Sequence, residues 1–325
     1  MPLATQKILV TGATGFVGRA LVDRLLAEAC TVRAAVRTLS ADLPAVVDQI
    51  AVGEIGPDTD WTRAVAAVDG VVHLAARVHM TGEESPGALP LYQEVNAAGA
   101  AALASAARRA GVRRFVLMST TTVYGDRSRA RAFDESSPPA PASPYARSKL
   151  EGERLVAAAL RESATQLVVL RPPLVYGPGA KGNFARLVAL VQRGLPLPLA
   201  SVDNRRSLVF VGNLVDAILR VLEHPAAAGR TYVVADGEAV STATLIARIA
   251  AALGRGSRLL PCPPALLRYG AGLLGRGDEA SRLLDDMTVD SSRIRAELSW
   301  TPPYGLEEAL ARSVAEPLSE PETQG

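Results

Sequence analysis

The sequence has few cysteines and no long hydrophobic run, and both scarcities restrict its class. Only Cys30 and Cys262 are present, far apart and without metal-ligand spacing around them, so we expect neither a disulfide framework nor a metal site. No apolar stretch approaches the roughly 18 residues of a membrane span. A strand pattern already begins at Lys7, which leaves no room for a signal peptide. We therefore expect a cytoplasmic protein.

An excess of either charge is also missing. The net charge is +2, and basic residues alternate with acidic ones without a Lys or Arg run, which argues against nucleic acid or a membrane surface as a partner. The 325 residues are 48% hydrophobic and 21% charged, which is ordinary globular usage and enough for a large core. Residues 316–325 are rich in Pro, Glu and Ser, so we expect a disordered tail there.

The glycines near the N-terminus follow a pattern with a chemical meaning. A short apolar run at residues 7–11 leads directly into Thr-Gly-Ala-Thr-Gly-Phe-Val-Gly, and an amphipathic helix is predicted over residues 17–29. Glycines in a strand–turn–helix unit allow the backbone to approach a pyrophosphate, whose charge the helix N-terminus favours. A tight turn without a ligand is the alternative. The dinucleotide contacts predicted in this turn are Gly12, Gly15, Phe16, Val17 and Gly18.

Strand patterns alternate with helical patterns through the first half of the chain. Further strands are predicted at residues 31–36, 49–52, 70–74, 114–118 and 167–170, and helices at 61–68 and 96–110. This alternation predicts an α/β fold with a doubly wound parallel sheet, a Rossmann domain over residues 1–175.

The second half has a different composition. Helical segments at residues 184–193, 213–224, 242–253 and 265–274 are joined by loops rich in Gly and Pro. We predict that residues 176–315 form mainly a smaller C-terminal cap that binds substrate. One strand from this half, near 208–211 or at 231–235, is expected to join the main sheet.

The end of the second strand bears on cofactor choice. Val36 and Arg37 stand where an acid would bind the ribose hydroxyls of NAD, whereas an Arg can accept the extra phosphate of NADP. NADP is therefore favoured over NAD, with a solvated Arg37 as the alternative. Glu54 follows the third strand and is expected at the adenine end. The other predicted cofactor contacts are Ile55, Leu74, Ala75, Ala76, Asn96, Pro172 and Val175.

The heptapeptide Ser-Pro-Tyr-Ala-Arg-Ser-Lys, residues 143–149, carries the chemistry. Pro144 suits the first position of a helix, which places Tyr145 and Lys149 on one face. At about 4 Å and an effective dielectric near 20 their attraction is on the order of 4 kcal/mol, enough to bring the pKa of a phenol toward neutrality. A surface Tyr beside a solvated Lys is the alternative.

The polar run Ser119–Gly125 follows the fifth strand, so its hydroxyls either face the ligand crevice or reflect ordinary β-propensity. His73 is expected to pack structurally in the sheet, and His79 has no predicted role.

Taken in order, these motifs resemble the extended short-chain dehydrogenase/reductase family, in its nucleotide-sugar epimerase, dehydratase and reductase branch. The resemblance runs from the glycine turn through STTTVYG, SPYARSK and LRPPLVYGPG to DSSRIRAELSWTP. It implies that Tyr145 is the catalytic acid/base, that Lys149 lowers the Tyr145 pKa and binds the nicotinamide ribose, and that Thr120 orients the reacting sugar oxygen. It further implies a UDP-linked sugar held by Asn183 and Arg206, and a homodimer through residues 96–110 and 145–163.

One departure from the family pattern limits the reaction. Sugar 4,6-dehydratases carry an Asp and a Glu where this sequence has Thr121 and Thr122, and threonine does not supply an acid/base pair near neutral pH. Both threonines are expected to face substrate, and loss of water is not expected. We therefore expect an enzyme that transfers a hydride at sugar C4, and the favoured prediction is a UDP-sugar 4-epimerase. The alternatives are an NADPH-dependent reductase of a 4-keto sugar and an NADP-binding regulator without turnover.

Overall fold

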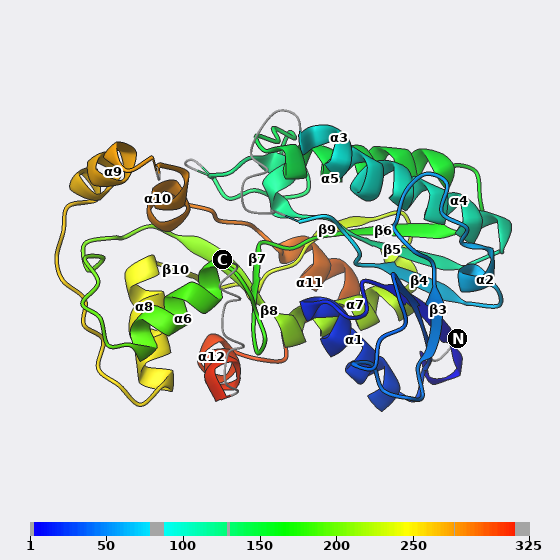
Figure 1. Cartoon of the computed structure of the whole chain (residues 1–325), viewed down its shortest axis with the longest axis horizontal. Helices are drawn as coiled ribbons and strands as arrows, with labels where there is room; N and C mark the ends of the chain where they lie inside the picture. The colour runs from blue at the N-terminus through cyan, green and yellow to red at the C-terminus, as the bar shows by residue number, and fades with distance from the viewer. Residues whose placement is uncertain (1–2, 79–87, 129–130, 276, 316–325) are drawn as a thin grey trace.

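The structure, a computed structural model, describes residues 3–78, 88–128, 131–275 and 277–315 (Figure 1). Its main feature is a parallel sheet of seven strands in the order β3-β2-β1-β4-β5-β6-β9. Their bounds are β1 Lys7–Thr11, β2 Thr31–Val36, β3 Asp48–Ala51, β4 Gly70–His73, β5 Arg114–Met118, β6 Gln166–Arg171 and β9 Thr231–Val233. The predicted α/β fold with a Rossmann-type sheet is confirmed. The strand order reverses between β1 and β4, which is where such sheets bind ligands.

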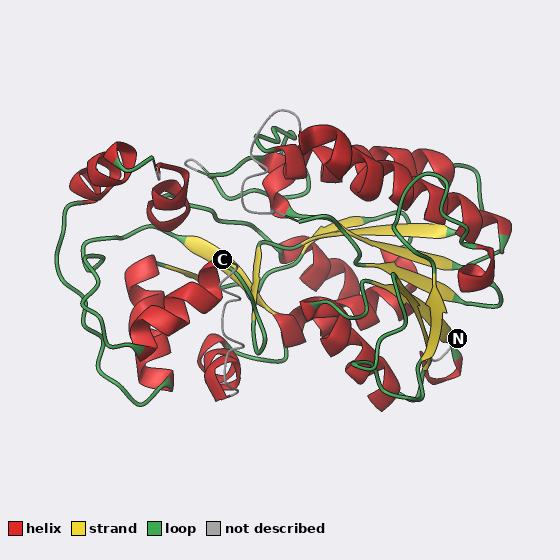
Figure 2. Cartoon of the chain, in the orientation of Figure 1, coloured by secondary structure: helices red, strands yellow, loops and turns green. Residues whose placement is uncertain are grey.

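Alternation along β1 explains why both faces of the sheet are covered. Ile8 and Val10 belong to one hydrophobic cluster and Leu9 to another, and all three are fully buried. Figure 2 shows helices on both sides of the strands. One side carries α2 Thr62–Val65, α4 Ala100–Arg109 and α5 Pro144–Ala159; the other carries α1 Phe16–Ala27, α7 Val211–Glu223 and α11 Ser292–Leu298. Helices therefore cover both faces of the sheet, as its apolar central strands require.

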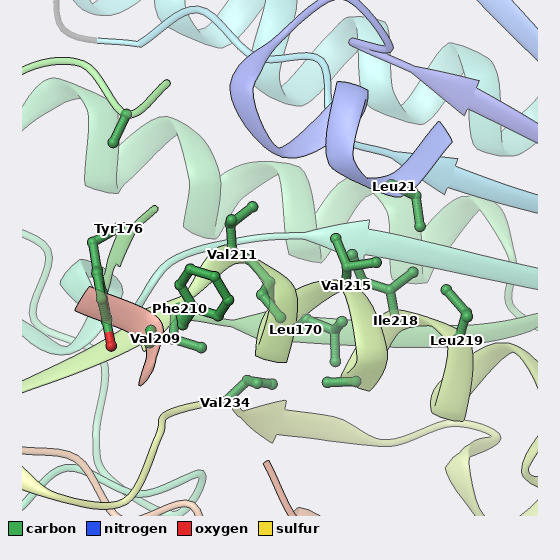
Figure 3. Close-up of a cluster of buried hydrophobic side chains, with 14 of the residues drawn as sticks. Leu21, Leu170, Tyr176, Val209, Phe210, Val211, Val215, Ile218, Leu219 and Val234 are labelled. Atoms are coloured by element: carbon green, nitrogen blue, oxygen red, sulfur yellow. The ribbon is translucent and has the colours of Figure 1, made fainter. Parts of the chain in front are cut away.

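The smaller part of the molecule lies beyond the carboxyl ends of the strands (Figure 1). It contains a second sheet in the order β10-β8-β7. Its elements are β7 Leu174–Tyr176, α6 Asn183–Gln192, β8 Arg206–Phe210, β10 Ala239–Val240, α8 Thr242–Ala252, α9 Pro264–Leu273, α10 Gly277–Leu284 and α12 Leu306–Ala315. Figure 3 shows that Tyr176 and Phe210 of this part and Leu21 and Leu170 of the main part belong to one cluster of buried side chains. The two parts share a core.

Several elements differ from the sequence prediction. Of the two candidate strands, residues 231–233 join the main sheet, while 206–210 lie in the small sheet. Helix α7 lies within the segment assigned mainly to the cap but packs against α1 of the main part. The helix predicted at 61–68 shortens to α2. The helix predicted at 96–110 begins inside a π-helix, η3 Glu94–Gly99, continues as α4, and is preceded by α3 Leu89–Gln93. His79 and residues 316–325 lie outside the described residues.

Candidate active site

The glycine turn between β1 and α1 leaves room for a ligand backbone. Gly12 has φ +69°, and a Cβ on it would lie 2.8 Å from the amide nitrogen of Ala75. The Gly15 amide donates to the Gly12 carbonyl at 3.0 Å. Gly15 is the N-cap of α1 and has no side chain to cap the helix, so the first amides of α1 are available to an anion. The turn fits the diphosphate of a dinucleotide.

The carboxyl ends of β1 and β4 are joined by a buried polar contact. Thr11 Oγ1 lies 2.8 Å from His73 Nδ1 and accepts a hydrogen bond from the Ala75 amide at 3.1 Å. Burial lowers the pKa of His73 to about 3, and the charge of Lys149 adds to this effect. His73 is therefore neutral at physiological pH, and its predicted structural role is confirmed.

Asn96 connects the loop after β4 to helix α5. Its side-chain oxygen accepts from the Arg77 amide at 2.8 Å, and its amide donates to the Arg77 carbonyl and to Ser148 Oγ, both at 2.9 Å. Asn96 is buried, and its polar atoms are engaged within the protein. It was predicted as a cofactor contact, but here it positions the loop beside Ala75 and Ala76.

Helix α5 begins as the heptapeptide predicts. Ser143 Oγ accepts from the Ala146 amide at 3.1 Å, and Pro144 is the first helical residue. Burial raises the pKa of Tyr145 to about 12, with the charge of Tyr92 as a second cause. The expectation that Lys149 brings this pKa toward neutrality is wrong for the chain by itself, because burial disfavours the charged phenolate.

Lys149 follows Tyr145 by four residues on α5 and is 4% exposed. Burial lowers its pKa to about 8, and the charge of Glu153 opposes that shift. Lys149 is therefore a buried amine that remains largely protonated at neutral pH. The ring of Tyr92 meets Tyr145 edge to face, with centroids 6.4 Å apart.

A cleft of about 1470 Å³ separates the strand ends from the cap, and the predicted substrate residues line it. Its walls hold Thr120, Thr121, Thr122, Tyr145, Val175, Asn183 and Arg206, together with Tyr92 and Tyr124, which the sequence did not single out. Lys149 lies behind this wall and not on it. Pro172 contributes its carbonyl to the Thr121 amide at 3.0 Å, which holds the threonine turn against β6.

The three threonines have different local roles. Thr120 Oγ1 accepts from the Thr122 amide at 3.2 Å and lies 3.1 Å from Thr122 Oγ1, so it caps the short 3₁₀ helix η4, Thr121–Tyr124. Thr121 Oγ1 is buried and has no hydrogen-bond partner within the described part of the chain. Thr121 lines the cleft, but its hydroxyl oxygen is turned into the protein and is closed off from it.

The far side of the cleft carries a half-buried cation, Arg206. Arg206 donates to the Asp285 carbonyl at 3.0 Å. Burial lowers its pKa, while Asp285 and Asp286 oppose the shift. Asn183 is the first residue of α6 and follows Gly182, whose φ is +75°. A cationic fork and a helix start facing one cleft suit a diphosphate.

Arg37 and Glu54 form an ion pair away from the cleft, with Arg37 Nε 3.1 Å from Glu54 Oε1. Arg37 follows β2 and Glu54 follows β3, which are neighbouring parallel strands. No acidic residue follows β2 in the sequence, but Glu54 from the loop after β3 lies beside the end of β2. Ile55 packs against the core cluster of α4, and Leu74 against the cluster of α1.

The described residues contain no group of His, Cys, Asp and Glu able to hold a metal ion. Within the same residues no helix is long and apolar enough to cross a membrane. Both cysteines are free thiols.

The fold, the glycine turn and the Tyr–Lys helix beside a polar cleft define a dinucleotide-dependent enzyme of the short-chain dehydrogenase/reductase type. The chain belongs to the NAD dependent epimerase/dehydratase family, whose sequence profile matches residues 8–235.

The chain is 38% identical over 312 residues to a UDP-glucose 4-epimerase of Vibrio cholerae, covering 95% of this chain and 94% of that protein. It is 32% identical to a UDP-glucose 4-epimerase of Mycolicibacterium smegmatis, covering 95% and 97%. Among solved structures, a short-chain dehydrogenase/reductase superfamily protein of Agrobacterium tumefaciens with bound NAD superposes with a TM-score of 0.74 at 26% identity, covering 94% and 95%. The predicted family, enzyme class and nicotinamide cofactor are confirmed.

Proposed function

We propose that this enzyme is a UDP-sugar 4-epimerase that interconverts UDP-glucose and UDP-galactose. One observation carries the proposal: Thr120 and Tyr145 line the same cleft as Asn183 and Arg206. A proton-handling pair thus faces a cation that suits a diphosphate across a space large enough for a nucleotide sugar. The names of the two relatives supply the choice of sugar.

Each group has a distinct task in this proposal. Arg206 and Asn183 hold the diphosphate of the substrate, and Thr120 orients the hydroxyl at C4. Tyr145 takes the proton from that hydroxyl and later returns it, while the charge of Lys149 stabilises the phenolate. A nicotinamide cofactor held at the glycine turn would supply the reversible hydride transfer at C4.

The threonines at 121 and 122 support epimerisation over dehydration. Both line the cleft where an acid/base pair would be needed for loss of water. Both side chains end in neutral hydroxyls and not in carboxylates. A 4-keto sugar formed here is expected to be reduced again and not to lose water.

Arg37 supports a second candidate, an NADPH-dependent reductase of a UDP-4-keto sugar. Its side chain is exposed at the end of β2, where the phosphate of NADP would bind. We propose that the chain accepts NADP as well as NAD. An epimerase recycles its cofactor, whereas a reductase consumes NADPH in every turnover.

The experiment uses purified protein with UDP-glucose and NAD, followed by NMR of the sugar and by absorbance of the reduced nicotinamide. Appearance of UDP-galactose without net reduction of cofactor supports the epimerase. Net oxidation of NADPH with a 4-keto sugar selects the reductase instead.

A variant with Tyr145 replaced by phenylalanine tests the acid/base. We expect Tyr145→Phe to bind NAD normally and to lose at least about a hundredfold in turnover. Undiminished sugar conversion would show that another group moves the proton. Binding of NADP without any turnover by the wild-type chain would favour the regulator.

The helices α4 and α5, which pack against each other on one face of the sheet, support a further proposal. We propose that they form a homodimer interface. We also propose that the enzyme works in the cytoplasm, where its two thiols stay reduced. Light scattering of the purified protein measures the mass, and a monomer would contradict the dimer.

A further inference from the structure

Glu153 continues the face of α5 that carries the proposed catalytic pair. It lies four residues beyond Lys149 and eight beyond Tyr145 on that helix. Residues at this spacing are neighbours along one side of a helix. Glu153 is 8% exposed, so its carboxylate lies inside the protein.

The Glu153 carboxylate is bound on both oxygens. Arg171 Nε donates to Oε1 at 2.9 Å, Arg171 Nη2 donates to Oε2, and Ser119 Oγ donates to Oε1. The remaining Arg171 nitrogen, Nη1, donates to Tyr124 Oη at 2.6 Å, and the guanidinium lies 4.9 Å from the Tyr124 ring centroid. Glu153 raises the pKa of Arg171, which keeps the guanidinium charged. The carboxylate is therefore fixed in place by β5, β6 and the cleft wall.

The other groups around Lys149 carry no negative charge at neutral pH. His73 on β4 is neutral, since burial lowers its pKa to about 3. Tyr145 is protonated, since burial raises its pKa to about 12. In the described part of the chain, Lys149 interacts electrostatically with His73 and Glu153, the Tyr92 ring meets that of Tyr145, and Arg171 pairs with Glu153.

From this arrangement we infer that Glu153 is a positioning residue that holds Lys149 in its cationic form and thereby sets the upper pH limit of the reaction. The ion pair with Arg171 weakens that effect, because the guanidinium partly neutralises the charge of the carboxylate. Burial alone disfavours the cation, and Glu153 opposes the loss. The inference rests on the proposed function, in which a charged Lys149 stabilises the Tyr145 phenolate.

The test is the pH profile of kcat/KM for UDP-glucose in the wild-type enzyme and two variants of similar shape. Glu153→Gln keeps a partner for Arg171 and Ser119 but removes the charge, so the basic limb should move down by about one pH unit or more. Arg171→Gln removes the counterion of the Glu153 carboxylate, so its charge acts on Lys149 undiminished and the basic limb should move up. A general loss of structure would not move the basic limb down in one variant and up in the other.

Two further variants serve as controls. Ser119→Ala removes one hydrogen bond while leaving both charges, and its basic limb should match that of the wild type. Glu153→Asp retains the charge and should restore the limb that Glu153→Gln displaces. Circular dichroism at each pH establishes folding, and the Asp and Arg171 variants decide the question if Glu153→Gln does not fold.

The outcomes separate the inference from the proposed function. Wild-type protein that folds and converts no nucleotide sugar contradicts the proposed function. Wild-type protein that converts the sugar, with the basic limb unmoved in Glu153→Gln or moved the same way in Arg171→Gln, contradicts the role of Glu153.

Discussion

Arg37 and Glu54 place opposite charges where the adenosine end of the cofactor binds. Their side chains are 73% and 76% exposed, so their attraction is weak and a bound phosphate can replace the carboxylate. Glu54 also repels that phosphate, and it is the nearest acid at the position that selects NAD. The balance between NAD and NADP therefore depends on which partner Arg37 takes.

We predict that Glu54→Gln shifts cofactor preference toward NADP. Removing the carboxylate frees Arg37 and removes the repulsion, and an exposed pair of this kind accounts for about a fivefold change in affinity. Calorimetric dissociation constants for NAD and NADP measure the ratio. Arg37→Gln should shift it the opposite way, and equal ratios in all three proteins would exclude the pair from cofactor choice.

At the scale of elements, α5 is positioned by its close approach to the π-helix η3. A Cβ on Gly152 would overlap the carbonyl oxygen of Asn96, and Asn96 itself donates to Ser148 of α5. The helix carrying Tyr145 and Lys149 thus packs against the segment that also holds the loop after β4. Only glycine at 152 permits this distance.

We predict that Gly152→Ala destabilises the fold by about 1–3 kcal/mol, because the added methyl forces α5 away from η3. The shift should also lower turnover by displacing Tyr145. Gly270 of α9 offers a matched control, since a Cβ there meets nothing within 4 Å. Gly270→Ala should be neutral or stabilising by up to about 1 kcal/mol. Chemical denaturation measures both, and equal stability in the two variants would contradict the packing argument.

These elements also show what the sequence makes predictable. The glycine turn and the start of α5 were predictable because local chemistry determines them: Gly12 takes a positive φ, and Ser143 and Pro144 begin a helix. The contacts of Glu153 with Arg171 and of Arg37 with Glu54 were not, because they join separate elements. Burial of Tyr145 likewise depends on the whole fold, and it reversed the predicted direction of its pKa.

At the scale of the whole molecule, one hydrophobic cluster extends from β1 and α1 through α7 to α6 and α8 of the cap. The cleft therefore lies between parts that share a core, and its geometry depends on global stability. His73 lies at the centre of the sheet and is buried without a partner for Nε2 in the described residues. It links that stability to pH.

We predict that acid weakens the fold through His73. Its pKa falls from 6.5 in the unfolded chain to about 3 in the folded one, so between these values the unfolded chain binds more protons. The stability that depends on neutral His73 is fully present above pH 6.5 and is lost as pH falls toward 3. The free energy of unfolding should be about 2 kcal/mol lower at pH 5 than at pH 7 for this reason. Urea denaturation of wild type and His73→Asn at pH 7 and pH 5 measures it. Because asparagine does not titrate, the variant should lose about 2 kcal/mol less than wild type over this range, whereas equal losses would mean that His73 is protonated in the folded protein or is not the group responsible.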